Sequence, residues 1–247
     1  GTALAQVITA LLMLSLLLFG KSVLRLRAGE GIHFFKRHIK KALRIAVPVG
    51  VEQIVMCSAY VMSTKIVSPL GTIAIAAHSF AITAESLCYM PGYGIQAAAT
   101  TLVGQSVGAG RRYLSKHMAW LTVGLGVVMM SIGAVIMYFA APAMIGVLTP
   151  EPKIRELGTM VLRIEVFAEP FYALSIVASG ALRGAGDTFI PSCMNFVSMW
   201  LVRIPMSALL APRMGLKGVW LAMCIELCIR GILYFVRLKR GKWLKME

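Results

Sequence analysis

The sequence predicts an all-α integral membrane protein built around a six-helix transmembrane bundle, with one further membrane helix before it. Three observations lead to this fold class. The 247 residues are 58% hydrophobic and only 14% charged, and their mean hydropathy is +0.79. The apolar residues gather in long stretches, and basic residues occupy the short segments between them. A soluble domain could not bury that much apolar surface, whereas a lipid bilayer accepts it.

The apolar stretches have the length of membrane-spanning helices, which need about 20 apolar residues to cross the hydrocarbon core. Seven stretches meet or approach that length, and they cover residues 2–19, 44–67, 74–103, 118–141, 157–182, 189–211 and 216–236. They are too long for strands, and lipid accepts only helices or closed barrels. We therefore expect seven helices, of which the last six form a bundle over 44–236.

The polar segments complete the expected organisation. In the longest of them, 21–43, apolar and basic residues alternate with helical spacing, which predicts an amphipathic linker on the membrane surface. Residues 142–156 contain three prolines, which predict a sizeable loop on the outer side of the membrane. Residues 237–247 form a basic tail. The chain begins at Gly1 inside an apolar run, without a basic leader, which predicts an interior fragment rather than a signal peptide.

The basic residues predict the orientation of the helices, because loops rich in Lys and Arg stay in the cytoplasm. When loops are assigned alternately to the two sides, seventeen basic residues fall in the segments 21–44, 111–116, 183 and 237–245, and only Lys153, Arg155, Arg213 and Lys217 fall on the other side. We therefore expect a multi-pass protein of the inner (plasma) membrane with a cytoplasmic C-terminus. The net charge of +15 is then an orientation signal, and we expect no nucleic-acid partner.

Two glycine-rich strings lie on the predicted cytoplasmic side. The first runs Gly104-Gln105-Ser106-Val107-Gly108-Ala109-Gly110-Arg111-Arg112, and the second is Arg183-Gly184-Ala185-Gly186-Asp187-Thr188 with Pro191. Glycines four residues apart allow helices to approach closely. Asp187 and Thr188 could cap a helix that starts near Phe189. No Walker-type phosphate loop occurs in the sequence, so the chain itself offers no ATP-hydrolysing motif.

Both strings resemble the signature strings of the multidrug and toxic compound extrusion (MATE) family of transporters, in their order, separation and side of the membrane. The resemblance covers the chain from about residue 44 onward. It implies that 44–236 is the C-terminal bundle of a two-bundle transporter, that 1–20 is part of the last helix of an N-terminal six-helix bundle that this chain lacks, and that 21–43 joins the two.

Five acidic residues lie within the predicted spans, where a charge costs about 2.5–3.5 kcal/mol on insertion scales and therefore marks a candidate functional site. They are Glu52, Glu85, Glu165, Glu169 and Glu226. Glu52 follows Pro48 and Gly50, and the family resemblance implies a proton or sodium site on this helix, at Glu52 or about one turn later near Met56. A carboxylate held by a neighbouring helix is the alternative.

Glu165 and Glu169 stand four residues apart, which would place them on one face of a continuous helix. Two carboxylates that close cannot both ionise cheaply in lipid, so we expect at least one to hold a proton or a cation. The family resemblance implies an acidic cation ligand on this helix near Tyr172. Glu169 is the first candidate for the coupling residue, because Glu165 could pair with Arg163. Pro170 should also leave a backbone carbonyl free.

The remaining ionisable residues have structural interpretations. Glu226 and Arg230 are spaced for an ion pair, and Arg203 could join them. Glu85 could face a central cavity, with Gln53, Met56 and Tyr172 as further candidates for substrate contact. Methionines and aromatic residues would suit a bulky apolar cation. The five cysteines and four histidines show no metal-ligand spacing.

The leading hypothesis is a secondary active antiporter that exports drug-like or metabolite substrates in exchange for H⁺ or Na⁺, without any other cofactor. Its partners would be membrane lipid and a small, organic, cationic substrate. The alternatives are a flippase for a lipid-linked precursor and a non-transporting membrane subunit. No nucleophile and base accompany the acids, so we do not expect an enzyme.

Overall fold

The computed structural model describes residues 2–19 and 35–244 and divides the chain into two units, 1–43 and 44–247. Most of the predicted linker 21–43 lies outside the described residues. In the first unit the apolar helix α1 covers Thr2–Phe19, and α2 begins there at Lys36 and continues to Val67 in the second unit. The remaining elements are η1 (Ser68–Leu70), α3 (Thr72–Gly108), α4 (Arg112–Leu148), α5 (Pro152–Glu165), α6 (Glu169–Gly184), α7 (Phe189–Val197), η2 (Ser198–Arg203), α8 (Ile204–Met214) and α9 (Leu216–Arg240).

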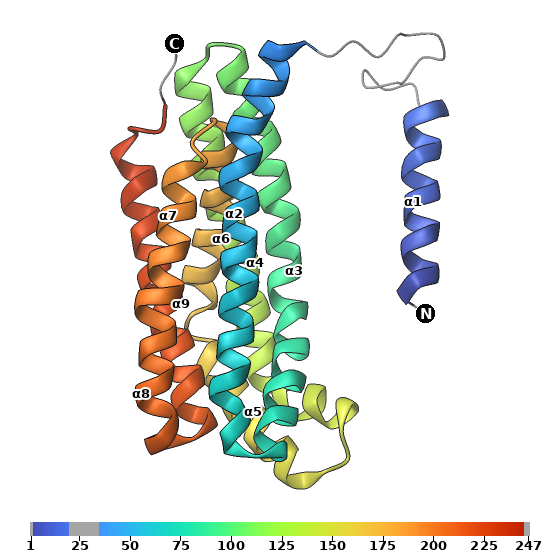
Figure 1. The fold of residues 1–247 in the computed structure, drawn as a ribbon, viewed down its shortest axis with the longest axis vertical. Coiled ribbons are helices and arrows are strands. Elements are labelled where there is room, and N and C mark those ends of the chain that lie inside the picture. The colour runs from blue at the N-terminus through green and yellow to red at the C-terminus, as the bar shows by residue number, and fades with distance from the viewer. Residues whose placement is uncertain (1, 20–34, 245–247) are drawn as a thin grey trace. The chain divides into compact units, whose positions relative to one another are not determined.

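The second unit is an all-helical bundle, and strands are absent from the described residues (Figure 1). Five helical stretches in the described part are long and apolar enough to cross a membrane, namely Ala46–Leu70, Thr72–Gly108, Arg112–Leu148, Phe189–Met214 and Leu216–Arg240. The predicted span 157–182 is absent from this set because it is broken into α5 and α6 at residues 166–168. The expectation of six continuous helices in the bundle is therefore wrong at this point.

Two other boundaries differ from the sequence-based expectation. The predicted outer loop 142–156 is mostly helical, since α4 continues through Pro142 to Leu148 and α5 begins at Pro152. A proline is tolerated at the first position of a helix because that N–H has no helical acceptor. The predicted span 189–211 contains the π-helical segment η2, which widens the helix between α7 and α8. Such π segments often occur at functional sites.

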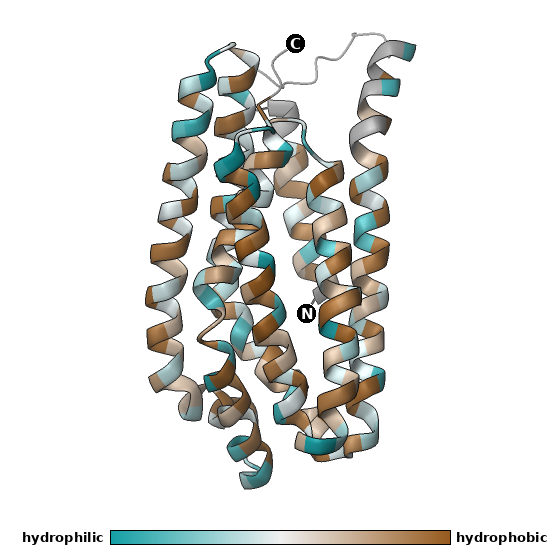
Figure 2. Ribbon diagram, turned by 90° about the vertical axis from the view of Figure 1, so that its left-hand side faces the viewer, coloured by the Kyte–Doolittle hydropathy of each residue, from teal (hydrophilic) through white to brown (hydrophobic). Residues whose placement is uncertain are grey.

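The bundle is apolar outside as well as inside. Figure 2 shows hydrophobic residues along most of the length of its helices, and large apolar side chains such as Leu87, Phe139 and Leu209 are exposed. This surface needs lipid or another apolar partner to cover it.

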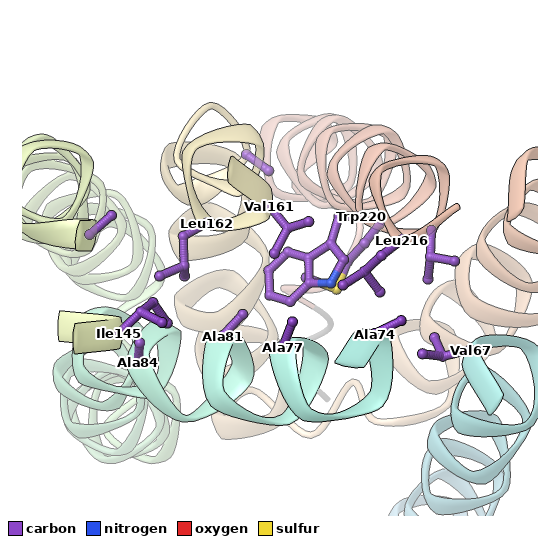
Figure 3. Close-up of a cluster of buried hydrophobic side chains, with 14 of the residues drawn as sticks. Val67, Ala74, Ala77, Ala81, Ala84, Ile145, Val161, Leu162, Leu216 and Trp220 are labelled. Carbon is purple, nitrogen blue, oxygen red and sulfur yellow. The ribbon is translucent and has the colours of Figure 1, made fainter. Parts of the chain in front are cut away.

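The interior packs large side chains against rows of small ones. Ala74, Ala77, Ala81 and Ala84 form one buried face of α3. Figure 3 shows that this row faces Trp220 and Leu216 of α9, with Val161 and Leu162 of α5 beside them. The Trp220 indole donates a hydrogen bond to Nδ1 of His78 (3.1 Å), so its buried N–H is satisfied.

Close contact between α3 and α6 depends on glycines, as the sequence predicts. A Cβ on Gly104 would lie 3.2 Å from the carbonyl oxygen of Gly184, and one on Gly184 would collide with the carbonyl oxygen of Thr100. Gln96 of α3 donates to Ser179 of α6 (2.8 Å) across this contact. Gly108 has open space around its Cβ position, so the spacing argument is wrong for that residue.

Candidate functional site: an interrupted helix and two polar cavities

The break between α5 and α6 is flanked by two buried acids. Glu165 is the last residue of α5 and Glu169 is the first residue of α6. The prediction that they lie on one face of a continuous helix is therefore wrong. Their exposed fractions are 0% and 1%. None of the four carboxylate oxygens accepts a hydrogen bond of good geometry from the described residues, and the weakly donating Cys88 thiol is the side chain that interacts with Glu169. Interrupted membrane helices are places where transporters expose polar groups to an ion or substrate.

Two features expected at this break, an ion pair and a free backbone carbonyl, are absent. Arg163 does not pair with Glu165, because its Nε donates to the Tyr138 carbonyl (3.4 Å) and its guanidinium lies over the Tyr138 ring. Pro170 cannot donate to the Val166 carbonyl, but that oxygen instead accepts from the Glu169 N–H (3.3 Å). The free carbonyl predicted from Pro170 is therefore not at this position.

Glu52 on α2 has the opposite environment. Its exposed fraction is 9%, and its oxygens accept from Arg183 Nη2 (2.7 Å), Ser192 Oγ (2.5 Å) and Asn195 Nδ2 (2.6 Å). These partners connect α2 to the end of α6 and to α7. Both carboxylate oxygens therefore have partners, and the Arg183 guanidinium balances the charge.

Two adjoining cavities lie between α2, α3, α6 and α9. The first has a volume of about 170 Å³, and its lining includes the predicted residues Glu52, Gln53, Met56 and Tyr172. The second has a volume of about 290 Å³, and its lining includes Glu85 and Tyr172. Both are also lined by Tyr60, Tyr93 and Arg230. The structure therefore gathers all the predicted cavity residues, while Glu165 and Glu169 line neither cavity.

The predicted ion pair between Glu226 and Arg230 is present. Arg230 donates two hydrogen bonds of 2.7 Å to the two oxygens of Glu226, and both residues are buried. Arg203 does not join this pair, and its side chain contacts the sulfur atoms of Met199 and Met223.

The two glycine-rich strings form the same turn at the ends of α3 and α6. Arg111 N donates to Ser106 O and Asp187 N donates to Leu182 O, the six-residue closure of a Schellman motif. Gly110 (φ 71°) and Gly186 (φ 83°) occupy its left-handed position, where a side chain would be strained. Much of each string is helical rather than loop, since α3 extends to Gly108 and α6 to Gly184.

The second string also differs from expectation in its cap. Thr188 precedes α7 without a side-chain capping bond. Asp187 instead accepts two hydrogen bonds from Arg237 of α9 (2.6 and 3.1 Å). Pro191 lies in α7, and its carbonyl accepts from the Tyr234 hydroxyl (3.2 Å). The string thus joins α6, α7 and α9 at one end of the bundle.

Comparison with known proteins decides the family. The family model "MatE" matches residues 48–209, well over half of the chain. The chain belongs to the MatE family.

Curated relatives align with most of this chain, but the aligned part is only about half of each relative's own length. A "Probable multidrug resistance protein NorM" of Thermotoga maritima is 32% identical over 214 residues, which are 83% of this chain and 45% of the relative. An "Uncharacterized transporter YisQ" of Bacillus subtilis is 24% identical over 99% of this chain and 54% of its own length. The chain thus spans about half the length of these relatives.

Solved MATE structures share the fold. The "Crystal structure of MATE in complex with MaL6" has a TM-score of 0.87 at 17% identity and covers 99% of this chain and 56% of its own. The bent form of the Vibrio cholerae MATE transporter VcmN has a TM-score of 0.79 at 14% identity, over 84% of this chain and 48% of its own. The resemblance read from the two strings is confirmed.

Sequence reasoning missed several residues that surround Glu52. Ser192 and Asn195 were not singled out, because they act through contacts between helices far apart in the chain, whereas Tyr93 was among the aromatic residues expected to suit a cavity. Arg183 was recognised only as part of a string. A hydrophilic residue on an otherwise apolar span, such as Asn195, was the one available clue. Clusters of metal-ligating residues are absent from the described ranges.

Proposed function

We propose that the protein carrying this chain is a secondary active antiporter that exports small drug-like or metabolite compounds in exchange for H⁺ or Na⁺. Several relatives carry the name of multidrug resistance proteins, and that name supports the proposal. The family consists of transporters, and we assign no catalytic residue to this chain.

One observation carries the proposal: two buried acids without an ion-pair partner in the described residues flank a break in a membrane helix. An ionised carboxylate there would be costly, and a bound proton or Na⁺ removes that cost. If the carboxylate is stable in one conformation only with a bound ion and in another without it, ion binding shifts the balance between the two conformations. Glu169 is our first candidate for the ion-binding residue, and Glu165 is the second.

The two cavities would hold the transported compound or part of it. Tyrosine rings line both, and they offer stacking surfaces and hydroxyl groups. Of the charges on the wall of the larger cavity, Glu85 suits the cationic substrate that the sequence favours, whereas Arg203 suits an anion. Because the chain spans about half the length of its relatives, we propose that a second six-helix bundle completes the substrate path.

We also propose that the end of the bundle formed by the two glycine-rich turns and the C-terminal end of α9 faces the cytoplasm. The excess of basic residues in those segments supports this orientation. Single cysteines placed at Lys242 and Lys153 should react with a membrane-impermeant maleimide from opposite sides. Labelling of both positions from outside intact cells would contradict the orientation.

Gradient-driven efflux tests the proposed function. The full-length protein is reconstituted into vesicles, and export of a fluorescent substrate is followed after a proton or sodium gradient is imposed. We expect Glu169→Gln to reduce coupled export to the level of empty vesicles, because Gln can neither release a proton nor supply a full charge to Na⁺. Glu151→Gln, an exposed acid at the start of α5, is the matched control.

Two results would overturn the proposal. One is export by the unaltered protein that continues at the same rate without any ion gradient. The other is complete absence of export for every compound tried under both gradients, although the protein is folded and inserted.

A further inference from the structure

Arg203 is a buried cation without an acidic partner. It is the last residue of the π-helical segment η2, and its exposed fraction is 5%. Its Nε has no hydrogen-bond partner among the described residues, and its terminal nitrogens donate to the sulfur atoms of Met199 and Met223. Thioether sulfur is a weak acceptor, so these contacts compensate poorly for the lost hydration of a guanidinium.

Glu85 and Glu165 are close enough for their charges to act on Arg203, but neither forms an ion pair with it among the described residues. Glu226 is bound through both oxygens by Arg230. Glu85 lines the same cavity as Arg203, yet none of the ion pairs found in the described part of the chain joins them. A buried, unpaired guanidinium is costly, and this cost indicates that an anion takes the empty position in another state of the protein.

The cavity in front of Arg203 suits an aromatic molecule. Its volume of about 290 Å³ lies at the small end of ligand sites. Tyr60, Tyr89, Tyr93 and Tyr172 form much of its wall, and Met223 and Leu227 also line it. Tyr89 packs edge-on against both Tyr93 and Tyr172, with ring centroids 5.8 and 5.9 Å apart, so the rings form a connected surface. A single aromatic ring can pack against such a surface.

We propose that this cavity binds an aromatic carboxylate, with Arg203 as the ion-pair partner of the carboxylate and the tyrosine rings as the contact surface of the ring. Guanidinium and carboxylate match in plane and spacing, which gives two parallel charge-assisted hydrogen bonds. This inference names a substrate class for the proposed exporter and rests on that proposed function. It predicts that the cavity prefers an anionic group to the cation expected from the sequence.

Binding of benzoate to the purified full-length protein, measured by isothermal titration calorimetry in detergent without any ion gradient, tests the proposal. We expect benzoate to bind, and the uncharged benzamide to bind about 10-fold more weakly, since hydrogen bonds to a charged group contribute that much. Chloride at equal concentration should not displace benzoate. Benzoate can fail to bind while ion-driven export persists, and export can fail while benzoate binds, so the two proposals are tested separately.

Variants assign the binding to Arg203. Arg203→Met should weaken benzoate binding by about 10-fold or more, Arg203→Lys should retain part of it, and Arg213→Gln, an exposed cation near the end of α8, should bind as the unaltered protein does. Arg203→Met should also melt at the same temperature as the unaltered protein or higher, because an apolar side chain replaces an unpaired buried charge. Glu85→Gln should strengthen benzoate binding, since it removes a repelling carboxylate from the cavity.

Four results would overturn the proposal. They are absence of benzoate binding, equal binding by Arg203→Met, displacement of benzoate by chloride at equal concentration, and a stability cycle in which Arg203→Met and Glu85→Gln each destabilise the protein while the double variant recovers. The third would assign the site to small inorganic anions. The fourth would assign Arg203 to Glu85 as a structural counter-charge.

Discussion

Glu52 and the pair Glu165 and Glu169 are all acids buried within one bundle, but their surroundings are opposite. Glu52 accepts hydrogen bonds from Arg183, Ser192 and Asn195. The carboxylate oxygens of Glu165 and Glu169 accept no hydrogen bond of good geometry from the described residues. The difference teaches that burial of an acid in a membrane helix does not by itself indicate an ion site. The absence of a partner is the more informative property.

The two sites also differ in what they connect. Glu52 holds α2 against α6 and α7, so its partners stabilise one arrangement of helices. Glu165 and Glu169 flank a break in a single span, where the backbone hydrogen bonds from Ala168 to Glu165 and from Glu169 to Val166 replace the regular α-helical pattern. We infer a structural role for the first site and an ion-binding role for the second. The prediction that Glu52 also binds the coupling ion stays a prediction.

The largest effect on stability should come from breaking the paired site. Arg183→Gln leaves the Glu52 carboxylate buried without its counter-charge, and we expect about 3 kcal/mol of destabilisation. Chemical unfolding in detergent, followed by near-ultraviolet circular dichroism, measures it. The double variant Arg183→Gln with Glu52→Gln should recover part of the loss. Purely additive losses would mean that the pair contributes nothing as a pair.

The contact that places Arg183 should show the next largest effect. Gly184→Ala would push a methyl group into the Thr100 carbonyl, and we expect a loss of about 1–3 kcal/mol. Gly108→Ala is the matched control, because its Cβ position is open and helical alanine is favoured over glycine. The melting temperatures of the two variants should therefore differ clearly. Equal values would contradict the tight α3 to α6 contact.

The ion pair between Asp187 and Arg237 should contribute less. Its side chains are 14% and 20% exposed, so water weakens the attraction. We expect Asp187→Asn to cost about 1 kcal/mol or less. A loss as large as that of Arg183→Gln would show that this end of the bundle depends on the second string more than its exposure suggests.

Removal of the unpaired charge should be the least costly change of all. Glu169→Gln removes no ion pair of the described residues, and a neutral amide is cheaper to bury than a carboxylate. We therefore expect its melting temperature to equal or exceed that of the unaltered protein. Marked destabilisation would indicate that the Glu169 carboxylate has a structural partner.

Much of the fold could be predicted from the sequence because hydropathy and helix length are local properties. The helices, the close approach at Gly184 and the pair of Glu226 and Arg230 all follow from spacing along one segment. The break at 166–168 could not be predicted in this way, since Val166, Phe167 and Ala168 are themselves apolar and include neither Gly nor Pro.

The surroundings of the acids were also beyond sequence reasoning. The partners of Glu52 lie 131 to 143 residues away in the chain, and no periodicity relates them. The same holds for Arg203, whose surroundings depend on how η2 packs against α9. Spacing could identify acids in the membrane, but only the packed bundle separates the satisfied ones from the unsatisfied ones.

Ion flux driven by a substrate gradient tests the central claim most directly. Vesicles containing the full-length protein are loaded with buffer, an opposing substrate gradient is imposed, and uptake of protons and of radioactive sodium is recorded for the unaltered protein, Glu169→Gln and Glu52→Gln. We expect substrate-driven uptake of one ion by the unaltered protein, none by Glu169→Gln, and a measurable flux by folded Glu52→Gln. Full flux through Glu169→Gln together with no flux through folded Glu52→Gln would contradict the account and assign the coupling ion to the paired site.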